Sequence, residues 1–290
     1  MKKKLLLILA ICLLVTTVLV SMVSCSAIAK LMSRSNTVNY QISIDDLEDA
    51  NVAEVVASNS VNSCARIIST FKTGGLEQSV SGAGFVITAD GYVITNRHVV
   101  VLYVNATRTK SSLEKTSECY IAVEPQEVKV VFMDGYVHKA SLEYFIDDES
   151  ELDLAILKMQ HESDVNYTYL QIDQTEELYY GQSVYSFGNP EGLGLLFCTG
   201  NVASPSLKMS NTSNYESIII DGNINHGNSG GALLNANGKV IGVVYARIEM
   251  KSSSSTTYGL GCAIKSSDLI NFIKGSPIAQ SVNYSEYKAE

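Results

Sequence analysis

The sequence predicts an all-β protein, either a barrel or a sandwich, from segment composition, the lack of helical patterns between segments, and chain length. Ten segments are short, rich in Val, Ile, Tyr and Phe, and bounded by Gly, Asn or Asp. They are 64–71, 82–96, 127–135, 136–146, 154–159, 182–189, 194–204, 217–221, 239–248 and 258–264. No helical pattern separates them, which argues against alternating strand–helix folds. The 290 residues, 46% of them hydrophobic, suit one domain of about 200 to 230 residues with a sizeable core.

Three segments outside these strands have distinct patterns. Residues 45–58 are predicted to form a short helix with acids in its first turn, and residues 266–275 a closing helix that ends at Gly275. Residues 104–126 are polar and long for a hairpin loop, so we expect a surface excursion. The sequence contains no internal repeat.

The N-terminus has the residue order of an export signal, which predicts a protein outside the cytoplasm and attached to the cell membrane. Three lysines precede an apolar run from Leu5 to Val23. The "MVSC" that ends at Cys25 resembles a bacterial lipoprotein box, which makes Cys25 a candidate for lipidation. The apolar run is also long enough for a retained transmembrane anchor, and the sequence leaves both readings open.

The domain organisation follows from these patterns. We expect a signal peptide or anchor at 1–25, a linker at 26–44, a single domain at 45–275 and a tail at 276–290.

Charge and cysteine content exclude some classes of function. The formal net charge is −9, and an acidic chain argues against nucleic acid as a partner. Four cysteines beyond the N-terminal segment lie far apart with no CxxC spacing, so we expect no metal site and no cofactor. They are Cys64, Cys119, Cys198 and Cys262. One or two disulfides and buried free thiols both remain open.

The stretch "HGNSGG" places Ser229 in a glycine-rich turn, where a serine is either a turn residue or a nucleophile. A serine hydroxyl reacts only when a nearby base removes its proton and a third group orients that base. Of the four histidines, His98 follows the end of a strand, from which a side chain can face a cleft. His138 and His161 are expected at the surface, and His226 is too close in sequence to act as the base.

The orienting acid is expected to be Asp153, which lies between Leu152 and Leu154 at the start of a strand. An acid between leucines more often points into a partly buried polar site, although a plain strand-start Asp is the alternative. The chain order His98, Asp153, Ser229 is that of chymotrypsin-type barrels, and it differs from the orders in α/β-hydrolases and subtilisins.

Five blocks of sequence, between about residues 50 and 275, resemble the signature blocks of HtrA/DegP-type trypsin-like serine proteases. They are "GAGFVITADGYVITNRHVV", "LDLAILK", "SFGNPEGLG", "DGNINHGNSGGALLNANGKVIGV" and "YGLGCAIKSSDLINFI". The resemblance implies two six-stranded antiparallel β-barrels of the chymotrypsin/trypsin type with a C-terminal helix, preceded here by the N-terminal membrane segment. It also implies polypeptide substrates and a homotrimer. No PDZ-like domain is expected, because only fifteen residues follow Gly275.

The same resemblance implies the roles of individual residues. His98 is the general base, Asp153 its orienter and Ser229 the nucleophile, while the backbone N–H groups of Gly227 and Ser229 form the oxyanion hole. The specificity pocket of this fold is implied to involve Asn223, Asn225, Val243, Val244 and Tyr245. These side chains carry no acid, which predicts cleavage after Val, Ala or Ile. Asp221 would favour cleavage after Lys or Arg if the register differed by two.

The function expected is a membrane-attached serine endopeptidase acting outside the cytoplasm on unfolded or specific envelope proteins. The alternatives are a protease-like scaffold or chaperone with little peptidase activity, and a lipoprotein esterase. Strand content and the order of the three residues disfavour the esterase.

Overall fold

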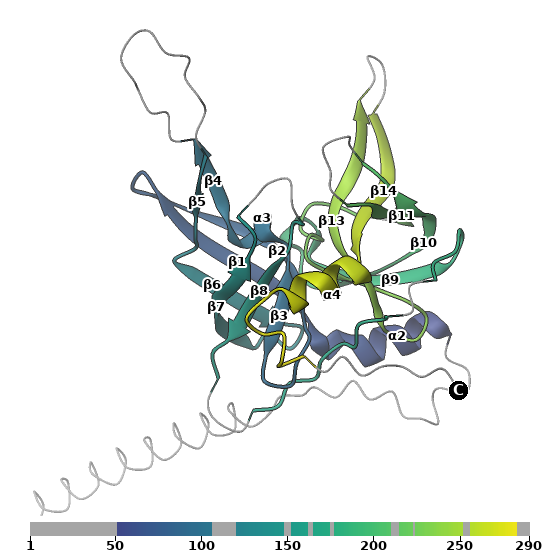
Figure 1. Cartoon of the computed structure of the whole chain (residues 1–290), viewed down its shortest axis with the longest axis horizontal. Coiled ribbons are helices and arrows are strands. Elements are labelled where there is room, and N and C mark those ends of the chain that lie inside the picture. The colour runs from purple at the N-terminus through teal and green to yellow at the C-terminus, as the bar shows by residue number, and fades with distance from the viewer. Residues whose placement is uncertain are drawn as a thin grey trace, which may run out of the picture. The chain divides into compact units, whose positions relative to one another are not determined.

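The protein is described here by a computed structural model, which covers part of the chain (Figure 1). The described residues are 51–105, 120–147, 152–161, 165–174, 177–209, 215–222, 224–251 and 256–282. All of them belong to the compact unit Tyr40–Glu290. The predicted segments 1–25 and 26–44, with Cys25, and the site residue Asn223 lie outside the described residues. No helix in the described ranges is both long and apolar enough to cross a membrane.

Twelve of the described strands form two closed antiparallel barrels, which confirms the predicted architecture. The first barrel contains β1 (Cys64–Thr73), β2 (Leu76–Val86), β3 (Tyr92–Thr95), β6 (Glu127–Phe132), β7 (Val137–Phe145) and β8 (Ala155–Met159). The second contains β9 (Ser183–Gly188), β10 (Leu196–Leu207), β11 (Ser217–Gly222), β12 (Ala232–Leu234), β13 (Val240–Lys251) and β14 (Thr256–Lys265). Closure leaves neither sheet with a free edge.

Both barrels have the same strand order. The first runs β1-β2-β3-β8-β7-β6 and the second β9-β10-β11-β14-β13-β12, when each is read from its first strand. The two halves therefore share one topology although the sequence has no internal repeat. In both, the first three strands and the last three form antiparallel meanders that close on each other.

Helices flank the barrels. α2 (Val52–Ser60) begins after Asn51, whose side chain and that of Glu54 form a capping box, and η2 (Val61–Ser63) follows it. This start is later than the predicted residue 45. α4 (Ser266–Lys274) confirms the predicted closing helix, and it buries an apolar face that includes Leu269 and Phe272. Two short helices, α3 (Arg97–Val100) and η3 (Pro190–Gly192), were not predicted.

Three strand features differ from the prediction. β4 (Leu102–Asn105) and β5 (Tyr120–Val123) pair as a hairpin that projects from the first barrel, at the two ends of the expected excursion (Figure 1). β2 begins six residues before the predicted start at Gly82, and β12, which directly follows the "HGNSGG" turn, was not predicted.

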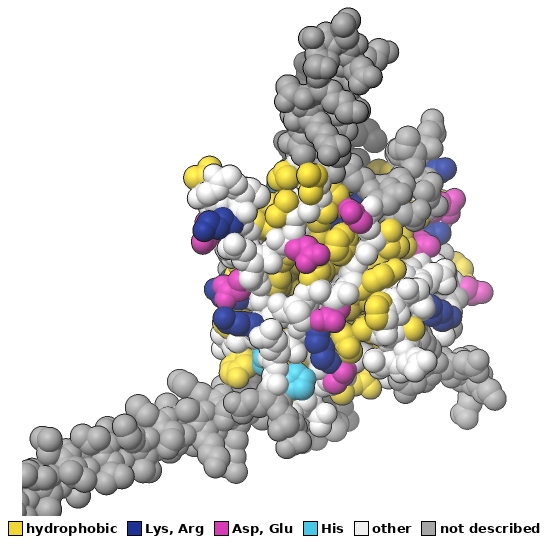
Figure 2. Space-filling model, turned by 60° about the vertical axis from the view of Figure 1, so that its left-hand side comes forward, with side chains coloured by type: hydrophobic (Ala, Val, Ile, Leu, Met, Phe, Trp, Pro, Cys, Tyr) yellow, Lys and Arg dark blue, Asp and Glu magenta, His cyan; other side chains and the backbone are white. Residues whose placement is uncertain are grey.

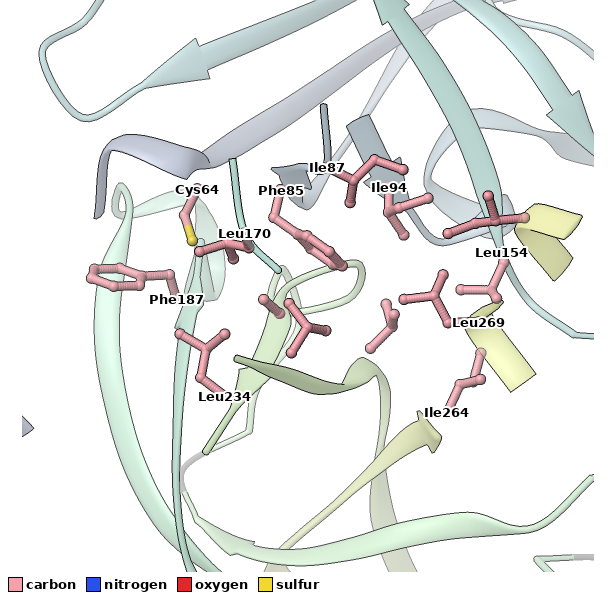
Figure 3. Packing of buried hydrophobic residues seen from close by; sticks show 14 of the residues in the cluster. Cys64, Phe85, Ile87, Ile94, Leu154, Leu170, Phe187, Leu234, Ile264 and Leu269 are labelled. Carbon is pink, nitrogen blue, oxygen red and sulfur yellow. The ribbon is translucent and has the colours of Figure 1, made fainter. Parts of the chain in front are cut away.

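A shared core joins the two barrels (Figure 3). Phe85, Ile94 and Leu154 of the first barrel are fully buried together with Leu234 and Ile264 of the second, and Leu269 of α4 joins them. Burying an aliphatic or aromatic side chain contributes about 1.5–3 kcal/mol. This core holds the barrels against each other, which matters because the candidate site takes residues from both.

The described cysteines are free thiols. Cys64 and Cys262 are buried and Cys198 is partly buried, whereas Cys119 lies outside the described residues. Burial raises the pKa of the Cys262 thiol to about 11. Of the alternatives left open by the sequence, free thiols are found for these three residues, two of them buried and one partly buried.

Acidic and basic side chains are interspersed on the face shown in Figure 2. No continuous basic stripe crosses that face, as a nucleic-acid phosphate backbone would require.

Candidate active site

The pairing of β3 with β8 brings His98 and Asp153 together. Thr95 at the end of β3 is opposite Ala155 at the start of β8, so the residues just beyond these strands lie side by side. His98 Nδ1 is 2.5 Å from Asp153 Oδ2, and the His98 backbone N–H donates to Asp153 Oδ1 at 3.0 Å. The carboxylate thus holds both the ring and the backbone of the histidine.

The Asp153 carboxylate is stabilised in its charged form. Its side chain is 17% exposed, whereas that of His98 is 48% exposed. Burial alone would raise the pKa of Asp153, but the hydrogen bonds and charge of His98 outweigh burial, with a further contribution from Arg97, and the net pKa is lowered. At neutral pH the carboxylate therefore accepts a hydrogen bond from His98 Nδ1–H, which leaves Nε2 free to accept a proton.

Ser229 lies in a turn that needs glycine on both sides. Gly227 and Gly230 have φ values of 95° and 89°. A Cβ on Gly227 would lie 2.0 Å from the backbone oxygen of Asn189, and one on Gly230 would lie 2.1 Å from that of Ala83. Only glycine combines this φ with so close an approach of other backbone.

The serine turn is anchored to both barrels. The Ala83 N–H of β2 donates to the Ser229 carbonyl at 2.8 Å, and the Gly230 N–H donates to the Val244 carbonyl of β13 at 2.8 Å. A Cβ on Gly230 would also lie 2.4 Å from Thr95 Oγ1, three residues before His98. The structure therefore places the Ser229 backbone beside the strand end that carries His98.

The Ser229 hydroxyl occupies a rotamer that faces the second barrel. Among the described residues its one hydrogen bond is to the Tyr245 carbonyl, at 3.3 Å. Catalytic hydrogen bonds are often formed only when substrate is present. No hydrogen bond joins the Ser229 hydroxyl to the His98 ring among the described residues.

The peptide between His226 and Gly227 has a fixed orientation. The Glu191 N–H donates to the His226 carbonyl at 2.8 Å. The described residues contain no cis peptide, and a trans peptide directs its C=O and N–H to opposite sides. The Gly227 N–H therefore points away from Glu191.

Sequence reasoning missed the loop that supports this peptide. Glu191 has φ of 51° and is the non-glycine residue with positive φ in the described part of the chain. Asn189 is 1% exposed; its side chain donates to Ser81 Oγ at 2.7 Å and accepts from Gly194 N–H at 3.0 Å. The "GNPEGLG" stretch with its three glycines was the available signal.

The structure corrects part of the predicted specificity pocket. Val243 and Val244 are both 0% exposed, because Val243 packs into the shared core and Val244 into the interior of the second barrel. A substrate side chain cannot reach either residue. Tyr245 is partly buried and its hydroxyl bonds Ser217 Oγ at 2.9 Å, while Asn225 is exposed.

A small hollow lies in the second barrel. Its lining carries no charged side chain and consists of Val184, Tyr185, Ser186, Cys198, Thr199, Gly200, Ile220, Gly222, Ile224 and Leu233. Ile224 lies five residues before Ser229 in the chain. The described ranges contain no group of three or more side chains suited to holding a metal ion.

Comparisons with known proteins agree with this geometry. The model of the trypsin-like peptidase domain family matches residues 82–243. The serine protease Do-like HtrA of Lactococcus lactis subsp. lactis is 30% identical over 263 residues, which cover 86% of this chain and 55% of the relative. The periplasmic serine endoprotease DegP of Escherichia coli is 32% identical over 219 residues, which cover 74% of this chain and 39% of the relative.

A solved structure shares the fold. The HtrA-type protease AlgW, solved with a tripeptide, matches with a TM-score of 0.59 and 24% identity, over 80% of this chain and 64% of that one. The chain spans about half the length, or less, of the two curated relatives. The family match covers more than half of the chain, from the second strand of one barrel to the fifth of the other. The chain belongs to the trypsin-like peptidase family, with HtrA/DegP proteases among its relatives.

Proposed function

We propose that the protein is a serine endopeptidase that cleaves polypeptides through an acyl-enzyme intermediate. Ser229 is the nucleophile, His98 the general base and Asp153 the group that orients His98. The observation that carries the proposal is the double contact of the Asp153 carboxylate with the ring and the backbone N–H of His98, beside the Ser229 turn.

The geometry supports a specific course for the protons. With Nδ1–H bound by Asp153, His98 Nε2 takes the hydroxyl proton as Ser229 Oγ attacks the substrate carbonyl. The resulting imidazolium then gives this proton to the leaving amine. Water then attacks the acyl carbonyl while His98 Nε2 takes its proton. This proton returns to Ser229 Oγ as the ester C–O bond breaks and the acid product leaves.

The proposed oxyanion hole consists of the N–H groups of Gly227 and Ser229. The His226 carbonyl is held by Glu191, which leaves the Gly227 N–H available on the opposite side of the peptide. Such a donor contributes on the order of 3 kcal/mol to the transition state.

Mutation of the nucleophile and the base tests this proposal. Ser229→Ala and His98→Ala should each abolish casein cleavage as fully as the double variant does, with losses on the order of a millionfold. Losses that multiply in the double variant would show that the two residues act independently.

For the substrate, we propose cleavage after small aliphatic residues such as Val, Ala or Ile. In place of Val243 and Val244 we propose Tyr245, whose carbonyl accepts from the Ser229 hydroxyl, and Ile224, which lines the hollow. Asp221, the alternative partner for a basic side chain, is exposed on β11. A peptide library read by mass spectrometry decides, and a dominant preference for Lys or Arg would overturn this assignment.

For the location, we propose a site outside the cytoplasm with membrane attachment through residues 1–25. The E. coli relative is named periplasmic, and the apolar run after three lysines supports export. Lipidation at Cys25 predicts a mature chain that begins at this residue. Mass spectrometry of the purified N-terminus distinguishes this from an uncleaved anchor, which would retain Met1.

One observation favours the second candidate, a protease-like scaffold with little activity. The Ser229 hydroxyl is bonded to the Tyr245 carbonyl. If that rotamer persisted with substrate bound, binding would occur without cleavage. Peptide binding by a chain that leaves casein intact would support this candidate.

A further inference from the structure

Three consecutive residues hold the segment that carries Asp153. The Asn96 side chain donates to the Asp153 carbonyl at 2.6 Å, and His98 contacts the Asp153 carboxylate. Between them, Arg97 donates from Nη1 to the Ile146 carbonyl at 2.9 Å. Residues 96–98 therefore bind both ends of the segment from Ile146 to Asp153.

The side chain of Arg97 is buried, which is unusual for an arginine. It is 6% exposed, and its guanidinium carbon lies 5.6 Å from the centre of the Tyr103 ring. Tyr103, on β4, donates its hydroxyl to Asp147 Oδ1 at 2.8 Å. Since an arginine keeps its charge at any ordinary pH, this geometry puts a permanent cation beside the segment that ends in Asp153.

We infer that Arg97 is a positioning residue of the proposed peptidase: it fixes the Ile146 end of the Asp153 segment and supplies a cation beside the His98–Asp153 pair. This inference rests on the proposed function. Arg97 acts through Asp153 and His98 and does not contact the substrate.

The charge of Arg97 should affect the charged forms of Asp153 and His98 in opposite directions. A cation near the pair favours the Asp153 carboxylate, whose pKa it helps to lower, and disfavours the protonated His98 imidazolium. Removal of that cation therefore favours the imidazolium form of His98 relative to its neutral form. The acidic limb of the kcat/KM profile, which reports the base in the free enzyme, should then move to higher pH.

Other charged or titratable groups also face this region. Tyr215, before β11, is close enough for Asp153 and Arg97 to affect its pKa, which burial raises. Tyr103 lies against the guanidinium and donates to Asp147. All three groups are the same in the wild type and in a variant at Arg97, so a difference in the acidic limb between them comes from the guanidinium.

Three variants of the full chain test the inference with a peptide substrate between pH 5 and 9. Arg97→Met removes the charge and keeps an unbranched side chain, whereas Arg97→Lys keeps the charge without the planar guanidinium. Arg66→Met is the matched control, because it removes a cation from β1 of the same barrel. Thermal melting establishes that each variant is folded.

For Arg97→Met we expect the acidic limb to move up by at least about half a pH unit. Its kcat should fall tenfold or more, with KM changing less than kcat. Arg97→Lys should restore the position of the acidic limb while kcat stays low, because lysine cannot reproduce the guanidinium geometry. Arg66→Met should match the wild type in both quantities.

An unchanged acidic limb in folded Arg97→Met, or a shift that Arg97→Lys does not restore, would overturn the inference. If Arg97→Met does not fold, Arg97→Lys decides, since wild-type kcat in that variant would exclude a positioning role. Failure of the proposed function appears differently, as a wild-type chain that cleaves no peptide at any pH.

Discussion

Replacing Gly227 by alanine should disable the proposed oxyanion hole while leaving His98 and Asp153 in place. An alanine Cβ would lie 2.0 Å from the Asn189 backbone oxygen, and real contacts of this kind stay above about 3.0 Å. The two backbone segments would have to separate by roughly 1 Å, a displacement that misplaces catalytic donors. The Gly227 N–H would move with its segment.

The structure gives the size of the effect. A non-glycine residue with positive φ costs about 1–2 kcal/mol. Separation also disturbs the bonds from Asn189 N–H to the Gly227 carbonyl and from Gly192 N–H to the Asn189 carbonyl, both 3.1 Å, each contributing about 1 kcal/mol. Displacing the oxyanion donor costs on the order of 3 kcal/mol in the transition state, so kcat should fall about 100-fold or more.

The assay compares kcat and melting temperature for Gly227→Ala and a matched control, Gly135→Ala. Gly135 has φ of 82°, and no atom lies within 4 Å of its ideal Cβ position. The control therefore has the same backbone strain without the collision, and its kcat should stay near wild type. A kcat for Gly227→Ala within threefold of the control would refute the reasoning.

Further predictions concern the His98–Asp153 pair, a partly buried histidine and the core. Asp153→Asn should lower kcat on the order of 10⁴-fold at neutral pH, because the amide favours the wrong His98 tautomer; a loss below tenfold would exclude the orienting role. Burial lowers the pKa of His138. Below about pH 6.5 the unfolded chain therefore binds more protons than the folded chain, and the free energy of unfolding decreases. The melting temperature of His138→Gln should therefore fall less between pH 7.5 and 5.5 than that of the wild type, and equal decreases would contradict this. Phe85→Ala, in the shared core, should cost about 3–5 kcal/mol in urea denaturation, whereas Leu76→Ala, 75% exposed, should cost little; similar losses would contradict the packing.

Strand composition predicted most of the barrel strands, because their apolar residues face a core. The β4–β5 hairpin was missed because its two strands are only four residues long and flank a polar stretch. β12 was missed because three residues, Ala232–Leu234, are too few to show a period and directly follow the glycines of the Ser229 turn.

The sequence predicts His98, Asp153 and Ser229 as the central residues of the site, and the structure brings the segments that carry them together. The pocket was predicted less well, because Val243 and Val244 lie on a strand covered on both faces. Alternation along such a strand does not separate a solvent-facing side from a buried side. Arg97 was missed since nothing in the sequence distinguishes a buried arginine from the surface cation that is usual at such a position.

Labelling with a fluorophosphonate probe tests most directly whether Ser229 is an activated nucleophile. The account predicts one adduct per chain, mapped to Ser229 by peptide mass spectrometry, and its loss in Ser229→Ala and His98→Ala. A folded wild-type chain that takes up no probe, or an adduct that persists in Ser229→Ala, would contradict it.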